Sequence, residues 1–296
     1  MIVYHYTSIN VLDKILNSYT QEKKTINLRA TYSNCLNDRY ENIIGENLIQ
    51  QMISEIENEL NIPILYRIDG LFHNKQYMTM IRNEIKENEK HIEEKLYNVV
   101  TSFSKAKDIA PMWLMYGDKG HGISLGFDTN NLCEHLYNSN KINIINRDCI
   151  YLTKRQLELN TVNKHSDAYR YIKWLYEKIT APQVLSSMYN INQNLLKIKR
   201  TIVTNLIYFL SQYYKLYEWN VEEEYRIAFG EYPIFMKMNE NNTLYTNIPI
   251  NINRLKEIII GPKCTIEEEN KIYKLFHKYN LTNLLEQIKK SQSSLQ

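Results

Sequence analysis

The order of the periodic segments along the chain restricts the possible folds more than any other feature. Segments in which apolar and polar residues alternate are typical of strands, and segments with apolar residues every three or four positions are typical of helices. Here the two kinds do not alternate regularly, as they would in a chain of β-α-β units. We therefore expect an α+β fold around a central mixed or antiparallel sheet. The expected strands are residues 2–6, 26–31, 99–103, 123–127, 142–152, 224–229, 244–250 and 256–260.

Several expected helices begin at recognisable capping residues. Ser8 precedes a segment with apolar residues on one helical face, and Thr265 stands three positions before Glu268, which is the capping-box spacing. Asp38 and Glu41 have the same spacing. These signals predict helices over about 9–16, 41–60 and 266–279, and we expect two more over 74–97 and 110–116.

Residues 154–217 lack a strong strand pattern and indicate a helical block, which Pro182 should interrupt. No linker rich in Gly, Ser or Pro and no internal repeat divides the 296 residues. We therefore expect a single α+β domain over residues 1–296, with residues 154–217 as a large helical insertion.

The composition excludes several classes of protein. Lys and Arg number 36 against 33 Asp and Glu, and a net charge of +3 does not by itself indicate a nucleic-acid binder. The first residues lack the basic and apolar regions of a secretion signal, and no run of 18 apolar residues could span a membrane. The four cysteines form no CxxC motif and the seven histidines no HExxH motif. We expect a cytoplasmic protein without a metal site or a membrane partner.

The segment Trp219 to Arg226 carries the most chemical information. Three carboxylates, Glu222, Glu223 and Glu224, stand at the start of an expected strand. Alternation would place Glu222, Glu224 and Arg226 on one face of that strand. Acids at the end of a buried strand, beside an arginine, suit a substrate site and equally a salt-bridged edge.

The glycines at 120, 122 and 126 do not form a dinucleotide-binding loop. Such a loop follows a strand and opens a helix, whereas these glycines follow an expected helix and open an expected strand. They indicate a tight turn.

Six segments taken together resemble a bacterial family of proteins of unknown function, DUF2971. They are Tyr4 to Ser8, Leu36 to Asp38 with Glu41, Ser102 to Ser104, Met112 and Trp113 with Tyr116, Gly122 to Asp128, and Trp219 to Arg226. The resemblance covers the chain except the block at 154–212. It departs from the family pattern at Arg39, where proline is usual.

The layout of these segments also resembles ADP-ribosyltransferases of the His-Tyr-Glu type. The resemblance implies that an early strand with His5, Tyr6 and Thr7 binds NAD, and that Glu224 or Glu222 positions the ribose. Ser102, Ser104 and Tyr116 compete for the middle position, and Arg226 should pair with one of the acids. The implied activity is NAD-dependent ADP-ribosylation of a macromolecule, protein or nucleic acid, by a toxin or antiphage effector. We expect His5 and Glu224 to flank one cleft, with Glu222 nearer its mouth.

Two other functions remain open at this point. The first is nucleic-acid binding by basic and aromatic residues of the helical block. The second is a non-catalytic regulatory protein with a degenerate site. The residues of the first alternative are Lys197, Lys199, Arg200, Tyr208, Tyr213, Tyr214, Lys215 and Tyr217.

Overall fold

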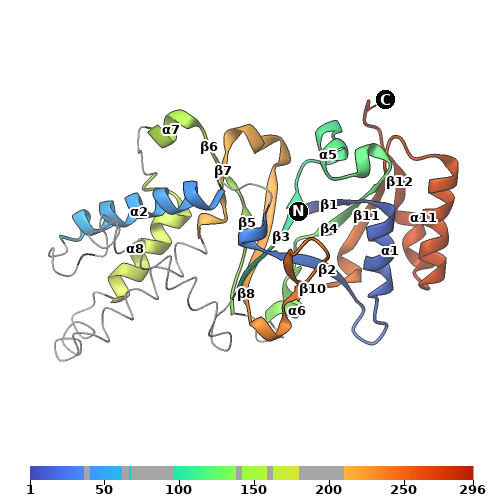
Figure 1. The fold of residues 1–296 in the computed structure, drawn as a ribbon, viewed down its shortest axis with the longest axis horizontal. Helices are drawn as coiled ribbons and strands as arrows, with labels where there is room; N and C mark the ends of the chain where they lie inside the picture. Colours follow the sequence, from blue (N-terminus) through green and yellow to red (C-terminus); the bar gives the residue numbers. More distant parts are fainter. Residues whose placement is uncertain are drawn as a thin grey trace. The chain divides into compact units, whose positions relative to one another are not determined.

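The computed structural model describes residues 1–36, 41–61, 67, 97–137, 142–158, 163–179 and 210–295 (Figure 1). The chain forms two compact units. The first combines Met1–Cys35, Leu96–Cys149 and Glu218–Gln296, and the second combines Leu36–Lys95 and Ile150–Tyr217. Each unit is therefore built from segments that are far apart in the sequence.

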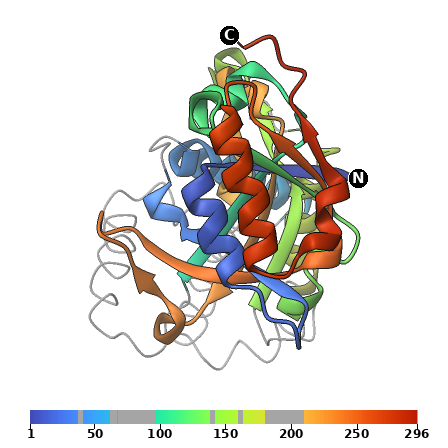
Figure 2. The same cartoon turned by 90° about the vertical axis from the view of Figure 1, so that its right-hand side faces the viewer.

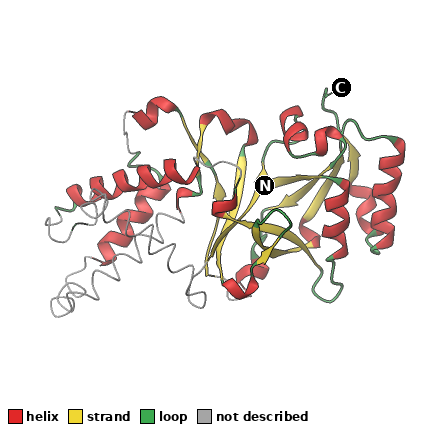
Figure 3. Cartoon of the chain, in the orientation of Figure 1, coloured by secondary structure: helices red, strands yellow, loops and turns green. Residues whose placement is uncertain are grey.

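The first unit contains a large mixed sheet, whose strands are yellow in Figure 3. The path through the sheet is β12-β11-β4-β1-β3-β2-β10-β9, with β8 paired to β3 and β5 paired to β8. Only β11 and β12 are parallel among these pairs in the described residues. The α+β class and the mixed sheet are thus confirmed. The strands are β1 (Ile2–Thr7), β2 (Thr25–Tyr32), β3 (Tyr97–Ser104), β4 (Ile123–Asp128), β5 (Ile142–Asp148), β8 (Glu224–Glu231), β9 (Lys237–Met238), β10 (Leu244–Asn251), β11 (Leu255–Ile260) and β12 (Ile288–Lys290).

Strand β3 is the junction of this sheet. Along one edge it pairs with β8 over its whole length, from Tyr97 opposite Glu231 to Ser104 opposite Glu224. Its other edge is shared, because β1 pairs at its end through Tyr4 and Ser104, and β2 pairs near its beginning. The three strands that carry His5, Ser102 and Glu224 are therefore neighbours.

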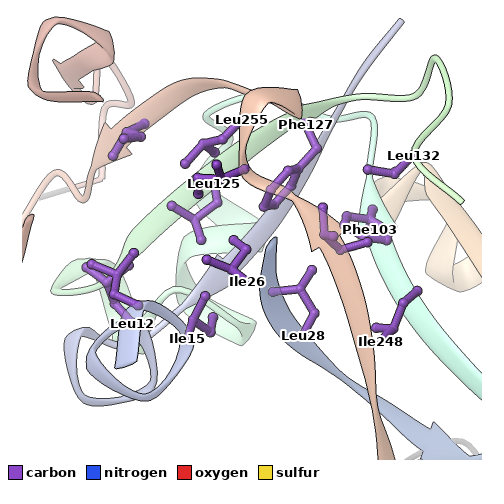
Figure 4. Close-up of a cluster of buried hydrophobic side chains, with 14 of the residues drawn as sticks. Leu12, Ile15, Ile26, Leu28, Phe103, Leu125, Phe127, Leu132, Ile248 and Leu255 are labelled. Atoms are coloured by element: carbon purple, nitrogen blue, oxygen red, sulfur yellow. The ribbon is translucent and has the colours of Figure 1, made fainter. Parts of the chain in front are cut away.

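The main hydrophobic core covers one face of the sheet. In Figure 4, Leu12 and Ile15 of α1 (Ile9–Asn17) point toward Leu125 of β4 and Ile26 of β2. Helix α1 begins where the sequence predicts, because the Ser8 side chain accepts a hydrogen bond from the Val11 N–H. Helix α11 (Ile266–Lys278) starts at a complete capping box and runs beside α1 (Figure 2). Each fully buried aliphatic side chain contributes about 1.5–3 kcal/mol to this core.

A smaller cluster covers the opposite face. Tyr4 and Tyr6 of β1 pack there with Trp113 of α5 (Ala110–Met115). Pro111 stands in the first turn of α5, where its missing N–H costs no helical hydrogen bond. Both faces of β1 are therefore covered.

The second unit contains α2 (Glu41–Glu59), α7 (Lys154–Glu158) and α8 (Asp167–Ile179), with β6 (Ile150–Leu152) parallel to β7 (Tyr214–Leu216). Strand β7 lies in the block that was expected to have no strand, so that expectation is wrong at its end. Three residues are too few for a visible alternation. The Lys164 ammonium joins both Glu55 and Glu59 of α2 at 2.8 Å. The expected helix at 74–97 lies outside the described residues except for Tyr97, which begins β3, and the break at Pro182 also lies outside them.

The remaining described elements are short. They are α6 (Glu134–Tyr137) and the 3₁₀ turns η1 (Ser33–Cys35), η3 (Asp118–Gly120), η4 (Tyr217–Glu222), η5 (Pro233–Phe235), η6 (Ile252–Arg254) and η7 (Thr282–Gln287).

Candidate functional site

The register of β1, β3 and β8 decides which side chains share a face. Tyr4 lies opposite Ser104, and Ser104 lies opposite Glu224, so these three side chains point to one face of the sheet. Ser102 and Arg226 are directly paired and point to the same face. His5 follows Tyr4 and points to the other face. The expectation that His5 and Glu224 flank one cleft is therefore wrong, because successive residues of a strand alternate between faces.

His5 is partly buried on the core side of β1. Its ring meets Phe103 edge-on at 5.9 Å between ring centroids, and its Nδ1 lies 3.4 Å from the Ser102 carbonyl oxygen. Burial lowers the pKa of His5 below 6.5, although the Ser102 carbonyl acts in the opposite direction. Thr7, two residues on, is buried on the same face. His5 thus contacts the Ser102 carbonyl oxygen from the core side of the sheet.

Glu224 and Arg226 form a buried ion pair. The Arg226 Nε donates to Glu224 Oε1 at 2.7 Å, and Nη2 donates to Oε2 at 2.9 Å. The two residues are only 5% and 2% exposed. The Cys149 thiol lies 3.7 Å from Glu224 Oε2. The expected pairing of Arg226 with an acid is present, and it holds the Glu224 carboxylate in a bidentate geometry.

Glu222 does not continue the strand. Glu223 has a φ of +40°, so the backbone turns there and β8 begins only at Glu224. Glu222 ends η4 instead, and its expected placement on the β8 face is wrong. It is buried rather than at a cleft mouth. Its carboxylate accepts a hydrogen bond from Tyr116 Oη at 2.5 Å, and its carbonyl accepts one from Ser104 Oγ at 2.6 Å.

Tyr116 is the exposed end of this cluster. It is 40% exposed and forms the C-cap of α5. The next turn is conformationally restricted, because Asp118, Lys119 and Gly120 all have φ between +52° and +98°. A Cβ on Gly122 would lie 2.2 Å from the Thr7 carbonyl oxygen, so the turn fits closely against the end of β1. This packing fixes the direction in which Tyr116 leaves the helix.

The Tyr6 side chain makes contacts that stabilise the fold. Its hydroxyl donates to the Ala106 carbonyl at 2.9 Å and accepts from the Asp108 N–H at 2.7 Å. Its ring meets Trp113 edge-on, with 4.9 Å between centroids. Burial raises the pKa of Tyr6 to about 12. The phenol therefore stays protonated, and the buried Tyr6 side chain is occupied by contacts within the protein.

The basic and aromatic segment of the nucleic-acid alternative is only partly described. Tyr213, Tyr214 and Lys215 are buried, so their rings and charge are not available for stacking on bases or for binding phosphates. Tyr217 is exposed. Lys197, Lys199, Arg200 and Tyr208 lie outside the described residues.

Within the described ranges, no three His, Cys, Asp or Glu side chains come together in a way that could hold a metal ion. In the same part of the chain, no helix has the length and apolar character required to cross a bilayer.

Sequence patterns alone did not identify Asp108. Its carboxylate accepts hydrogen bonds from Trp113 Nε1 and from residues near the carboxyl end of the chain. Asp108 lies between Lys107 and Ile109 and belongs to no recognisable motif. Its partners, Ser291 and Gln292, are 183 and 184 positions away in the sequence. No local spacing could have revealed these contacts.

Comparison with known proteins gives a match to a protein family. Residues 112–227 match the family model described as "Protein of unknown function (DUF2971)". This supports the resemblance to that family. The matched range contains Tyr116, Glu222, Glu224 and Arg226 but not His5, Ser102 or Ser104. No curated protein and no solved structure matches the chain.

Proposed function

We propose that this protein is an ADP-ribosyltransferase that uses NAD to modify a macromolecule. The observation that carries the proposal is the contact between Tyr116 and Glu222. A phenol that is 40% exposed reaches a carboxylate that is only 3% exposed. It thereby links solvent to an acid beside the strand that bears Glu224. Ser102, Ser104 and Arg226 lie on the same face of the neighbouring strands as Glu224.

The transfer breaks the bond between C1′ of the ribose and N1 of nicotinamide. The bonding pair leaves with nicotinamide, and positive charge develops on the ribose. A nucleophilic atom of the acceptor forms the new bond to C1′ and releases its proton. A carboxylate held close to the ribose stabilises the developing charge and orients the ribose hydroxyls. NAD enters this reaction as a substrate.

The geometry gives the two acids different tasks. Both oxygens of Glu224 already bind Arg226, so Glu224 is a positioning residue that orders the start of β8. One oxygen of Glu222 binds Tyr116. We place the nicotinamide against the exposed ring of Tyr116, with the ribose beside Glu222. His5 supports the same site indirectly, through its contact with the Ser102 main chain on the opposite side of β3.

The proposal is tested by transfer of label from radioactive NAD to macromolecules of a bacterial lysate. Glu222→Gln should lower the transfer by about 100-fold, because it removes the stabilising charge. Glu223→Gln is the matched control, since that neighbouring side chain is exposed and the chemical change is identical. Absence of transfer by the wild type, or full transfer by Glu222→Gln, would contradict the proposal.

A second function, non-catalytic binding, is favoured by one observation. The buried pair of Glu224 and Arg226 satisfies an acid that the resemblance assigns to the reaction. A protein that binds NAD without consuming it would need such a fixed pair as much as an enzyme would. Calorimetric NAD binding without release of nicotinamide would support this second function over the first.

A further inference from the structure

Asp108 connects three separate parts of the first unit. It lies in the loop between β3 and α5. Its carboxylate accepts a hydrogen bond from Trp113 Nε1 at 2.8 Å and one from the Gln292 main-chain N–H at 2.6 Å. The Ser291 hydroxyl donates to the same carboxylate. Asp108 has a φ of +55°, a left-handed conformation that non-glycine residues adopt only when the surroundings hold them there.

One route from Asp108 reaches the main chain of Glu222. The Asp108 N–H donates to Tyr6 Oη, and Tyr6 Oη donates to the Ala106 carbonyl. The Ala106 N–H donates to Ser104 Oγ at 2.9 Å, and Ser104 Oγ donates to the Glu222 carbonyl at 2.6 Å. Each member of this route is fixed by the one before it.

A second route reaches the Glu222 carboxylate. Asp108 holds the indole of Trp113, which is fully buried in the middle of α5. Tyr116 is the C-cap of α5, and its Oη donates to Glu222 Oε1. Asp108 therefore stands at the start of both connections to Glu222, one through hydrogen bonds and one through a helix.

The segment after β12 holds Asp108 from the other side. Ser291 is anchored through its own N–H to the Ile260 carbonyl at 2.9 Å, at the end of β11. The Ser293 N–H donates to Ser291 Oγ, and Leu295 packs against the cluster of Tyr6 and Trp113. Residues 291–295 thus form a strap that lies across the loop and α5, and its polar contacts converge on Asp108.

We propose that Asp108 is a positioning residue through which the strap, residues 291–295, sets the geometry of Tyr116 and Glu222. When the strap holds Asp108, α5 and the Ser104 route keep Glu222 in place. When the strap is released, both connections loosen together. Any change that detaches residues 291–295 from Asp108 would therefore alter the position of Glu222 and regulate the site. The catalytic meaning of this coupling rests on the proposed function, whereas the coupling itself does not.

Hydrogen exchange measured by mass spectrometry tests the coupling without any need for activity. Ser291→Ala and Asp108→Asn should raise exchange several-fold in peptides covering residues 111–117 and 217–224. Lys290→Gln is the matched control, because Lys290 is the preceding residue but pairs with Glu269 of α11. Unchanged exchange at 217–224 in both variants would overturn the proposal. So would an equal increase throughout the first unit, because it would indicate general loss of stability.

A double-mutant cycle tests the catalytic part. In the wild-type background, Asp108→Asn should lower kcat for label transfer roughly tenfold and leave KM nearly unchanged, since it displaces a catalytic group. In a Tyr116→Phe background the same change should have a smaller further effect, because only the route through Ser104 still connects Asp108 to Glu222. Additive losses would overturn the assigned route. If the wild type shows coupled exchange but no transfer, the proposed function fails while the coupling stands.

Discussion

His5 makes the stability of the fold depend on pH near neutrality. Burial lowers its pKa below 6.5, so the folded state accepts a proton less readily than the unfolded state. The neutral, buried His5 ring therefore contributes its full stability above pH 6.5. This stability is lost as the pH falls from 6.5 toward the pKa of His5 in the folded state. Urea unfolding between about pH 7.5 and about pH 5 should show a weaker pH dependence for His5→Gln than for the wild type. His277→Gln, an exposed change on α11, should keep the wild-type slope. Parallel curves for wild type and His5→Gln would contradict this assignment.

Glu257 causes a second loss of stability, at more acid pH. Burial alone would raise the pKa of this carboxyl, but hydrogen bonds from Lys107, Lys289 and Tyr4 outweigh burial and lower it to about 2. Its contribution is therefore present above 4.5 and is lost as the pH falls from 4.5 to about 2. The shift corresponds to about 3 kcal/mol of unfolding free energy. Glu257→Gln should remove this acid-side loss, whereas Glu267→Gln should not. If Glu257→Gln still loses stability over this pH range, the loss belongs to another carboxyl group.

At the residue scale, the sequence identified polar residues that interact with one another. It did not identify the face of the sheet on which each of them lies. The pairing of Arg226 with an acid followed from their spacing of two on one strand. The face occupied by His5 did not, because it depends on the register of Tyr4 with Ser104 and of Ser104 with Glu224. These pairings join residues about 100 positions apart or more. Glu222 was misplaced for a local reason, since nothing in three consecutive glutamates indicates the left-handed φ of Glu223.

At the scale of elements, the turn after α5 should tolerate little change. A Cβ on Gly122 would lie 2.2 Å from the Thr7 carbonyl oxygen and 2.8 Å from that of Gly117, both main-chain atoms that cannot rotate away. Gly122→Ala should therefore lower the unfolding free energy by about 2 kcal/mol or more. Lys119→Gly, in the same turn, should be neutral or stabilising, because Lys119 has a φ of +55°. Chemical denaturation measures both. A neutral Gly122→Ala would show that the turn is not closely packed.

Helices with capping signals and the longer strands were predicted well, and the very short strands were not. Helices α1 and α11 begin at their capping residues, and their buried faces follow the apolar spacing. Strands β7, β9 and β12 have only three, two and three residues, so no alternation can develop within them. They are strands only because a neighbour supplies hydrogen bonds. Their sequences would be equally acceptable in a loop.

At the scale of the whole molecule, the sequence indicated the α+β class but not the topology. The division of one edge of β3 between β1 and β2 brings together segments from three parts of the chain. That arrangement is a long-range outcome of packing and leaves no local trace. The same holds for the two compact units, each of which is assembled from separated segments.

The central claim is that NAD binds where Tyr116 covers Glu222. Saturation-transfer NMR with the purified protein and millimolar NAD tests it most directly, because binding is observed without knowledge of the acceptor. The account predicts transfer to the nicotinamide protons with the wild type and with Glu223→Gln, and a strong reduction with Tyr116→Ala, whose folding is checked by circular dichroism. No transfer to NAD with the wild type, or equal transfer with a folded Tyr116→Ala, would contradict it.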